Sequence, residues 1–436
     1  MEDYALKNSR HAAVAALCKM RDHDSWSNLV LDGFINKLDE RDRAFTYALF
    51  YGTLTRAAAL DACIAAHSKT PLHKTDFAVR VVLRTAIYQL LYMDSVPEHA
   101  AVTEAVACVR LMRKSSAAGF VNAVLRSFLR AGKVIPIPEG PPQTRLSVEY
   151  SCDESLAKML IDSYGGTIAA EILADSLTPP PTFLRVNTLK TTDAELLYLL
   201  QERGAEAEFD ENFPHNLITR GQGALHSTPE FLQGLFHVQD RSSQLCALTL
   251  GARPGERVLD VCAAPGGKSF TLAQMMENEG ELVCCDLHEH RAKLVEKRAA
   301  EMGIGIISVK VADMSLPNPD LGQFDRVLCD VPCSGYGTMR RRPEIKYKSP
   351  DNFAELPGIQ YKILEKSSNY CKDGALLLYS TCTLNPEEND NVVDRFLENH
   401  KSFTQISRQT IKPGEHDGDG FFMALLKKWG ESSHED

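Results

Sequence analysis

The stretch VLDVCAAPGGKS, residues 258–269, decides the fold of the C-terminal part of the chain. Its first apolar residues indicate a buried strand, the segment Ala264-Pro265-Gly266-Gly267 a turn, and the residues from Lys268 onward a helix. Ligands of open α/β sheets bind beyond the carboxyl ends of the strands, where glycines let the backbone approach and a helix offers free N–H groups. The spacing does not match G-x-G-x-x-G, so the dinucleotide fingerprint is absent.

Strand-like and helix-like segments alternate after this turn. The expected strands are residues 257–263, 281–287, 305–313, 326–331 and 375–381, and the expected helices are residues 268–276, 290–303 and 359–371. Buried strands that alternate with helices of this length predict a doubly wound parallel sheet. We therefore expect a Rossmann-like α/β domain over residues 241–430.

Four successive strands of this domain end at or near an aspartate, namely Asp260, Asp286, Asp313 and Asp330. One such residue is more often a cap or turn residue, but four along one sheet edge favour a ligand site. Clustered carboxylates repel phosphates and suit an adenosine that carries a cationic centre, which points to S-adenosylmethionine and a methyltransferase. The expected cofactor contacts are Cys262, Ala263, Ala264, Pro265, Gly266, Gly267, Lys268, Asp286, Asp313 and Asp330.

The first part of the chain has a different pattern. Residues 11–20, 45–54, 77–93 and 100–112 repeat apolar residues at helical spacing, so we expect an all-α domain over residues 1–135. Four prolines between residues 136 and 142 favour an extended linker, and mixed helix and strand patterns follow it. We expect residues 136–240 to hold this linker and a small α+β domain.

Composition limits the class of protein without naming a partner. The net charge of −10 is uneven, at about +4 over residues 1–140, about −9 over residues 141–240 and about −5 beyond, so it neither supports nor excludes RNA. The twelve cysteines form no C-x-x-C pair, and His288 and His290 lack further ligand candidates, so we expect no metal. Without a signal peptide or a long apolar run, we expect a cytoplasmic protein with no membrane partner.

Several motifs together carry a family resemblance. VLDVCAAPGGKS, CCDL (284–287), VAD (311–313), DVPCSG (330–335) and STCTLNPEEN (380–389) resemble, in order and spacing, the RNA 5-methylcytosine methyltransferases. LRVNTLK (184–190), FHVQDRSSQL (236–245) and HDGDGFF (416–422) match as well, and the helical part resembles NusB, which binds RNA. The resemblance implies a multidomain protein: a NusB-like all-α domain, a small α+β domain, a class I methyltransferase domain and small-subunit ribosomal RNA as substrate.

Two cysteines follow two expected strands, Cys333 after residues 326–331 and Cys382 after residues 375–381. Methylation of C5 of cytosine needs a thiolate that adds to C6, an acid near N3 and a group that helps elimination. Asp330 is the candidate for N3, and Lys268 for orienting Asp330 or a thiol. The residues alone leave open which cysteine attacks. On the family resemblance Cys382 is the nucleophile and Cys333 assists release of the adduct.

A basic loop follows Cys333, and the target base must leave its stack to be reached from both faces. We expect RNA contacts from Arg340, Arg341, Arg342, Lys346 and Lys348, with nearby tyrosines for stacking. An amino-group methyltransferase is disfavoured because DVPC replaces an Asp/Asn-Pro-Pro-aromatic loop. Two alternatives stay open: the same chemistry on transfer RNA, and a non-catalytic RNA-binding factor.

Overall fold

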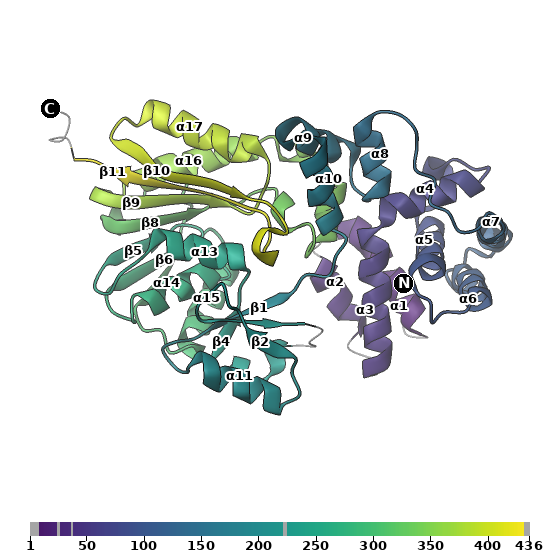
Figure 1. The fold of residues 1–436 in the computed structure, drawn as a ribbon, viewed down its shortest axis with the longest axis horizontal. Helices are drawn as coiled ribbons and strands as arrows, with labels where there is room; N and C mark the ends of the chain where they lie inside the picture. Colours follow the sequence, from purple (N-terminus) through teal and green to yellow (C-terminus); the bar gives the residue numbers. More distant parts are fainter. Residues whose placement is uncertain (1–7, 24–26, 36–37, 221–224, 431–436) are drawn as a thin grey trace. The chain divides into compact units, whose positions relative to one another are not determined.

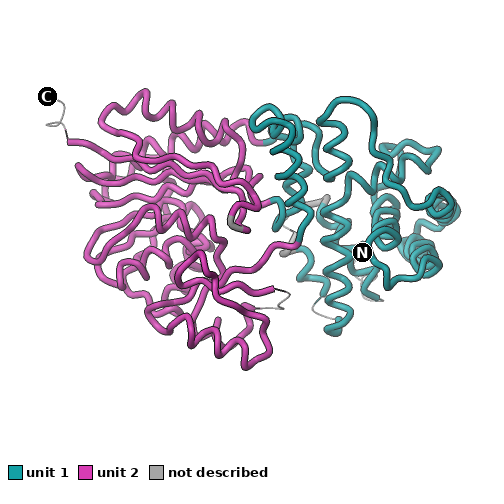
Figure 2. The backbone as a smooth tube through the Cα atoms, in the orientation of Figure 1, with its two compact units in different colours: residues 1–178, 339–352 teal, residues 179–338, 353–436 magenta. Residues whose placement is uncertain are grey.

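The computed structural model describes residues 8–23, 27–35, 38–220 and 225–430. The chain forms two compact units, which are coloured separately in Figure 2. Unit 1 comprises residues 1–178 and 339–352, and unit 2 comprises residues 179–338 and 353–436. A short segment that follows the catalytic candidate Cys333 in sequence therefore belongs to the first unit. In the described part of the chain, no helix has the length and apolar character needed to cross a membrane.

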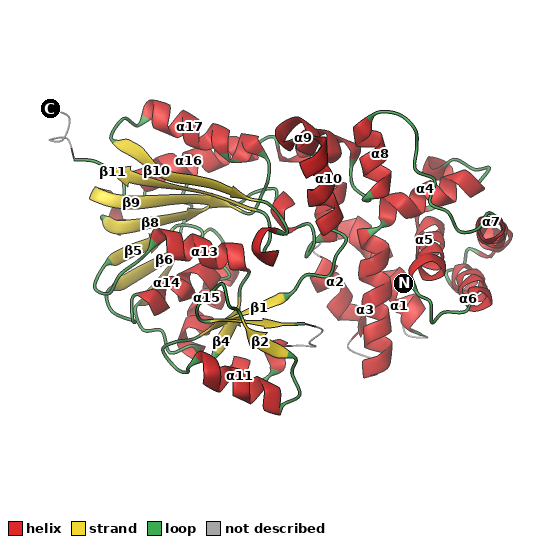
Figure 3. Ribbon diagram, viewed as in Figure 1, coloured by secondary structure: helices red, strands yellow, loops and turns green. Residues whose placement is uncertain are grey.

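Unit 1 is helical, as expected for its first 135 residues (Figures 1 and 3). Periodic apolar residues of these helices form one core that includes Leu49, Leu83, Val109 and Phe128. Asp76 caps one of the helices, because its carboxylate accepts a hydrogen bond from the N–H of Val79. The helices are α1 Ser9–His23, α2 Ser27–Ile35, α3 Glu40–Thr55, α4 Ala57–His67, α5 Phe77–Tyr92, α6 Glu98–Leu111, α7 Ala118–Arg130, α8 Pro142–Glu149, α9 Glu154–Tyr164 and α10 Gly166–Asp175.

Residues 136–178 differ from the expected linker and small domain, because α8, α9 and α10 belong to unit 1. The buried residues Leu156, Leu160 and Leu173 give α9 and α10 an apolar face. Ser151 joins this segment to α4 by accepting a hydrogen bond from the N–H of Ala59 at 2.9 Å. In this structure the proline-rich stretch therefore connects helices of unit 1.

Residues 339–352, which we call the strap, leave unit 2 after Thr338 and return to it at Phe353. The strap docks on the break between α3 and α4, where a carbonyl and an N–H lack helical partners. Tyr347 donates its hydroxyl to the carbonyl of Thr55 at 3.0 Å and accepts from the N–H of Ala57 at 2.9 Å. Lys346 donates to the same Thr55 carbonyl at 3.1 Å. These bonds make the strap part of the helical unit.

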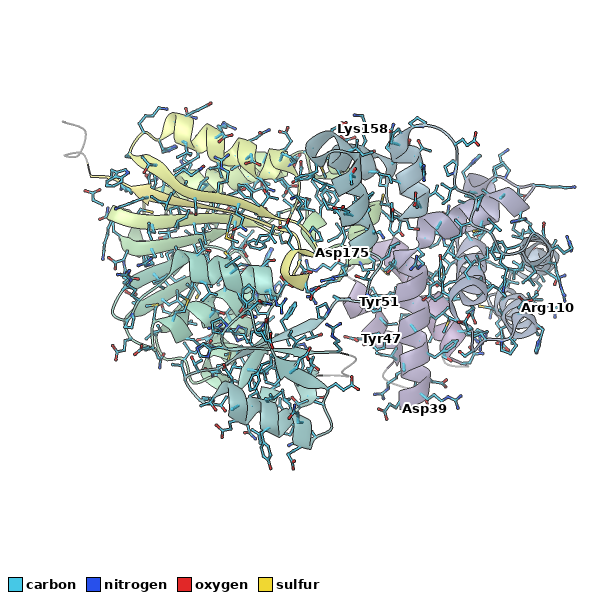
Figure 4. All side chains as sticks on the ribbon, viewed as in Figure 1. Asp39, Tyr47, Tyr51, Arg110, Lys158 and Asp175 are labelled. Atoms are coloured by element: carbon cyan, nitrogen blue, oxygen red, sulfur yellow. The ribbon has the colours of Figure 1, made fainter. Side chains whose placement is uncertain are left out.

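The strap corrects the prediction of an RNA-binding lip at two positions. Lys346 is fully buried, so in this structure its ammonium is not available to a phosphate. Arg340 is also largely buried and forms an ion pair with Asp175, the last residue of α10, which is labelled in Figure 4. Arg342 is exposed and Lys348 is half-buried. The sequence analysis assigned these charges to a surface, because no local sequence pattern indicates that the loop packs against helices far away in the chain.

Burial gives Lys346 a measurable effect on stability. Burial lowers the pKa of Lys346 to about 7, whereas an unfolded lysine titrates near ~10.4. Between these values the unfolded chain binds a proton that the folded chain lacks, so stability rises with pH from about 7 to about 10. Lys346→Met should therefore raise the free energy of unfolding at pH 7 by on the order of a few kcal/mol, which corresponds to a melting temperature several degrees higher. This gain should shrink towards pH 10.

Thermal unfolding at pH 7, 8.5 and 10 measures this effect. The carbonyl of Thr55 keeps the hydroxyl of Tyr347 in the variant, so no acceptor is orphaned. Lys348→Met, at a half-buried neighbour, is the matched control and should show no such pH dependence. A Lys346→Met gain that is constant from pH 7 to pH 10 would contradict the account.

Unit 2 contains a small antiparallel sheet with the strand order β2-β3-β1-β4. Its strands are β1 Thr182–Val186, β2 Ala207–Phe209, β3 Asn216–Thr219 and β4 Phe236–Val238. The helices α11 Asp193–Glu202 and α12 Pro229–Leu232 belong to this segment, and Leu196 and Leu200 of α11 pack with Leu184, Leu217 and Phe236 of the sheet. This α+β part confirms the expected middle domain in fold class.

The second sheet of unit 2 has seven strands in the order β10-β11-β9-β8-β5-β6-β7. Its strands are β5 Arg257–Asp260, β6 Glu281–Asp286, β7 Ile307–Val311, β8 Phe324–Asp330, β9 Cys371–Thr381, β10 Phe403–Ile411 and β11 Phe421–Lys428. The first five are parallel, as predicted, but β11 is antiparallel to both β9 and β10. The sheet is therefore mixed, and the purely parallel expectation is wrong at this edge.

Helices cover both faces of the mixed sheet, which can be followed in Figures 1 and 3. They are α13 Arg241–Leu250, α14 Gly267–Met275, α15 Glu289–Glu301, α16 Leu356–Ser368 and α17 Asp390–Asn399. Successive strand residues enter opposite cores: Leu377 and Tyr379 pack with α16 and α17, whereas Leu378 packs with α13, α14 and α15. The central strands of the sheet are buried on both faces, so its polar edge is the place for ligands.

Candidate active site

The carboxyl ends of β5, β8 and β9 bring two predicted site residues, Lys268 and Asp330, together with Ser380. Lys268, in the first turn of α14, donates to a carboxylate oxygen of Asp330 at 2.7 Å. The other Asp330 oxygen accepts from the hydroxyl of Ser380 on β9 at 2.8 Å. Asp330 ends β8, which lies between β5 and β9, so strand order alone produces this contact. The predicted pairing of Lys268 with Asp330 is present in the structure.

Lys268 stays charged although little of it is exposed. Burial opposes its ammonium form, but the carboxylate of Asp330 outweighs burial and raises the pKa of Lys268 above its usual range. Negative charge on Cys382 adds to this effect. The same attraction acts in the other direction, so the lysine favours a thiolate at Cys382. The site thus holds a positive charge that is bonded to a carboxylate and interacts electrostatically with a thiol.

The two candidate thiols lie in contact, with 3.3 Å between Cys333 Sγ and Cys382 Sγ. Cys333 follows β8 and Cys382 follows β9, and these are neighbouring parallel strands. A backbone hydrogen bond of 2.9 Å, from the N–H of Gly337 to the carbonyl of Cys382, joins the two turns. The sequence analysis placed each cysteine after the end of a strand, and the structure places the two sulfur atoms side by side.

Two glycines let a third segment close over these turns. The N–H of Gly420 donates to the carbonyl of Gly337 at 2.8 Å. A Cβ on Gly337 would lie 1.8 Å from the carbonyl oxygen of Gly420, which no side chain can tolerate. Glycine is therefore required at position 337 for this close approach. The segment around Gly420 belongs to the motif HDGDGFF, residues 416–422, so this motif packs against the turns that carry the two thiols.

The two thiols differ in their electrostatic setting. The hydrogen bond to Cys382 raises the pKa of Cys333 well above its usual value, and burial adds to this effect. Cys333 is therefore a thiol at neutral pH and can donate its S–H to the Cys382 sulfur. A neighbouring donor and the ammonium of Lys268 both favour negative charge on Cys382. The geometry suits an attacking Cys382 and a protonated Cys333.

A hollow of about 190 Å³ lies beside the Lys268–Asp330 pair. Six of the predicted cofactor contacts line it together with Asp330, whereas Gly266, Asp286 and Asp313 do not. The small sheet and the start of α13 contribute residues that sequence reasoning had not placed in the site, namely Val238, Gln239, Asp240 and Ser243. These four residues belong to the motif FHVQDRSSQL, residues 236–245. The motif could have indicated them, but by itself it suggests no catalytic or binding role.

Asp260 and Asp286, at the ends of β5 and β6, have different surroundings. Burial raises the pKa of Asp260 to about 7, although the Ser269 hydroxyl, 2.6 Å away, opposes the rise. Asp286 is also buried, accepts from the N–H of His288 at 3.0 Å and lies 3.6 Å from a guanidinium nitrogen of Arg291. The carboxyl group of Asp260 therefore makes its hydrogen bond within the protein. The carboxylate of Asp286 is suited to accept hydrogen bonds from the hydroxyl groups of a ligand.

Arg291 and Asp313 complete this edge of the sheet. Arg291, which sequence reasoning missed, also donates to the carbonyl of Ala264 at 2.7 Å and so joins the glycine turn to Asp286. Asp313 is exposed beyond β7, and hydrogen bonds from Ser315 lower its pKa. Its carboxylate thus serves a local turn, and the structure does not bring it to the hollow.

Gly266 is needed for a reason other than the predicted ligand approach. Its φ of +107° lies in a region that only glycine adopts without strain. A Cβ at Gly266 would also lie 2.3 Å from the ring of Phe270. Gly267, by contrast, lines the hollow, so the ligand-approach argument fits Gly267.

Comparison with known proteins identifies the relatives of this chain. Three family models match: NusB over residues 7–130, the Methyltr_RsmF/B-like ferredoxin-like domain over residues 154–225, and the 16S rRNA methyltransferase RsmB/F over residues 247–427. The probable ribosomal RNA small subunit methyltransferase B of Bacillus subtilis is 36% identical, covering 97% of this chain and 99% of that protein. The corresponding Synechocystis protein is 32% identical over the same shares.

A solved structure, PH0851, has the same fold. It superimposes with a TM-score of 0.82 at 24% identity and covers 96% of this chain and 98% of its own. The three family models follow one another in the order that the sequence predicted, helical, mixed and methyltransferase. The identity to full-length relatives settles the assignment, and the chain belongs to the family of ribosomal RNA small subunit methyltransferase B.

Proposed function

We propose that the protein transfers a methyl group from S-adenosylmethionine to C5 of a cytosine in small-subunit ribosomal RNA, through a covalent bond between Cys382 and C6. One observation carries this proposal: two thiols 3.3 Å apart lie at the ends of neighbouring strands, beside an aspartate–lysine pair. C5 of cytosine is a poor nucleophile, and a thiolate on C6 overcomes this. The ribosomal target rests on the names of the relatives, and the proposed site of action is the cytoplasm, where thiols stay reduced.

The residues around the hollow fit the cofactor. Asp286 is a buried acceptor one strand away from the glycine turn, which is the position for ribose hydroxyls. Asp240, Asp260 and Asp330 are among the residues that line the hollow, and their acidic character suits a sulfonium and an ammonium group better than a phosphate. When bound, S-adenosylmethionine supplies the electrophilic methyl group that C5 takes up.

The chain's own residues carry out the other steps. Cys382 adds to C6 as a thiolate, and the electron pair of the C5–C6 double bond becomes available at C5. Asp330, held by Lys268 and Ser380, shares a proton with N3 of the cytosine. N3 takes up this proton as the thiolate adds and returns it as the thiolate leaves, so that the ring carries no net negative charge. After C5 has gained its methyl group, its proton passes to water, the double bond forms again and the C6–sulfur bond breaks. Cys333 donates its S–H to the departing sulfur of Cys382.

Isotope-labelled nucleoside analysis tests the proposal. The purified protein is incubated with S-adenosylmethionine that carries a labelled methyl group and, in separate reactions, with unmodified small-subunit ribosomal RNA and unmodified transfer RNA. We expect labelled 5-methylcytidine from the ribosomal RNA alone. Label in transfer RNA alone would overturn the target, and label on another atom of the base would overturn the chemistry. No label in either RNA would favour a non-catalytic RNA-binding factor.

A further inference from the structure

A buried carboxylate lies behind the two thiol turns, and no step above uses it. Glu388 has no exposed surface and ends the 3₁₀ turn Pro386–Glu388, six residues after Cys382. Four donors from three segments of the chain point at its two oxygens. A buried carboxylate with this many partners is costly to place unless its position matters.

Ser334, which follows Cys333, contributes two of the four bonds. Its N–H donates to Oε2 of Glu388 at 2.9 Å and its hydroxyl donates to Oε1 at 2.5 Å. Asn385, from the turn that follows Cys382, donates its side-chain amide to Oε1 at 3.1 Å. One carboxylate thus binds the turn of Cys333 and the turn of Cys382 at once.

Gln360 of α16 supplies the fourth bond and extends the network. Its amide nitrogen donates to Oε2 of Glu388 at 2.9 Å and to the carbonyl of Pro332 at 2.9 Å. Pro332 directly precedes Cys333, so both neighbours of this cysteine are held, one by the carboxylate and one by its partner. The network is anchored in α16, a helix that packs on one face of the sheet, which gives the Cys333 turn a rigid support.

A chain of hydroxyl groups joins the residues that follow the two thiols. Ser334 Oγ donates its only proton to Glu388. In the 2.7 Å contact between the two hydroxyl groups, Thr383 Oγ1 is therefore the donor and Ser334 Oγ the acceptor. Thr383 follows Cys382 and Ser334 follows Cys333. Glu388 therefore orients a bond that crosses from one thiol turn to the other.

We infer that Glu388 is a positioning residue that holds the Cys333 thiol within reach of the Cys382 sulfur. It touches neither sulfur and acts through Ser334, Thr383 and Asn385. The inference rests on the proposed function for its catalytic meaning, because S–H donation by Cys333 to the departing sulfur needs this separation. Without the carboxylate, several buried donors lose their partner and the Cys333 turn is free to shift.

Glu388→Gln is the sharpest test, because glutamine keeps the size of the side chain. All four groups that contact the Glu388 carboxylate, from three residues, are donors, and a glutamine oxygen accepts only half of them while its NH₂ group faces the rest. Glu387→Gln is the matched control, since it removes the same charge from the adjacent, exposed residue. We expect Glu388→Gln to lower kcat by about ten- to a hundredfold with little change in KM, and Glu387→Gln to leave both unchanged.

A second readout measures thiol proximity without any methylation. Diamide oxidises two neighbouring thiols: a sulfur–sulfur bond forms, and the two protons and two electrons reduce its N=N bond to a hydrazine. Peptide mass spectrometry then follows the Cys333–Cys382 disulfide over time, in the absence of RNA and cofactor. We expect its rate to fall about tenfold or more in Glu388→Gln and to stay unchanged in Glu387→Gln.

The two readouts separate failure of this inference from failure of the proposed function. Slower disulfide formation in Glu388→Gln, with a wild-type protein that methylates no RNA, would support positioning and overturn the function. If the wild-type protein is active but Glu388→Gln forms the disulfide as fast as Glu387→Gln does, the positioning role of Glu388 is overturned. If Glu388→Gln fails to fold by circular dichroism, Ser334→Ala removes only the hydroxyl link, and an unchanged disulfide rate there would overturn the inference as well.

Discussion

Cys382→Ala should abolish formation of 5-methylcytidine, with a loss of about 10⁴-fold or more in kcat, because the variant lacks the thiolate that adds to C6. The variant should still bind S-adenosylmethionine, since Cys382 does not line the hollow beside Lys268 and Asp330. It should also form no RNA complex that survives denaturation. Labelled-nucleoside analysis, cofactor titration and denaturing gels measure the three properties in one set of samples.

The chain offers a matched control for this substitution. Cys371 is a buried cysteine at the opposite end of β9, the same strand that Cys382 follows. Cys371→Ala also removes one thiol, but far from the polar edge, so its activity should stay close to that of the wild type. Methylation by Cys382→Ala at a rate near that of Cys371→Ala would remove Cys382 from the mechanism.

Cys333→Ala should have the opposite signature and accumulate an RNA–protein adduct. In the wild type, Cys333 is a thiol 3.3 Å from the Cys382 sulfur, and it can donate to that sulfur as the adduct breaks down. Alanine removes the donor without touching the nucleophile, so the bond to C6 forms and then persists. Turnover should fall by about 10²- to 10³-fold, the range of positioned proton donors, while the first methyl transfer still takes place.

A denaturing gel of Cys333→Ala with labelled RNA should show a shifted band, and nuclease digestion of that band should release a methylated nucleotide. The double variant of Cys333 and Cys382 to alanine is the control and should give no band. A band from Cys382→Ala, together with normal turnover by Cys333→Ala, would reverse the roles of the two thiols. Absence of a band from every variant would exclude a stable covalent intermediate.

Much of this site followed from the sequence because it depends on strand ends. Asp330 ends one buried strand, Cys333 follows it and Cys382 follows the next strand in sequence, so a parallel sheet brings them together wherever those strands are neighbours. The position of Lys268 followed equally from the helix that begins after the glycine turn. These contacts need only local patterns and one topological rule.

Other features depend on long-range packing that no local pattern reveals. The strand β10 carries mostly polar residues and was missed, because its pairing with β11 and not its apolar content holds it in place. Lys346 appears in a basic run yet lies buried on the break between α3 and α4. Glu388 belongs to a polar turn motif, and its role emerges only when donors from three separate segments meet at its oxygens.

The central claim is that Cys382 forms the covalent bond to cytosine while Cys333 assists its release. The most direct measurement uses the wild-type protein, S-adenosylmethionine and small-subunit RNA made with 5-fluorocytidine, whose C5 carries no proton to lose, so that the adduct cannot collapse. Digestion of the trapped complex and mass spectrometry then locate the nucleotide on the peptide chain. We predict a methylated 5-fluorocytidine nucleotide on Cys382. The same nucleotide on Cys333 would contradict the account.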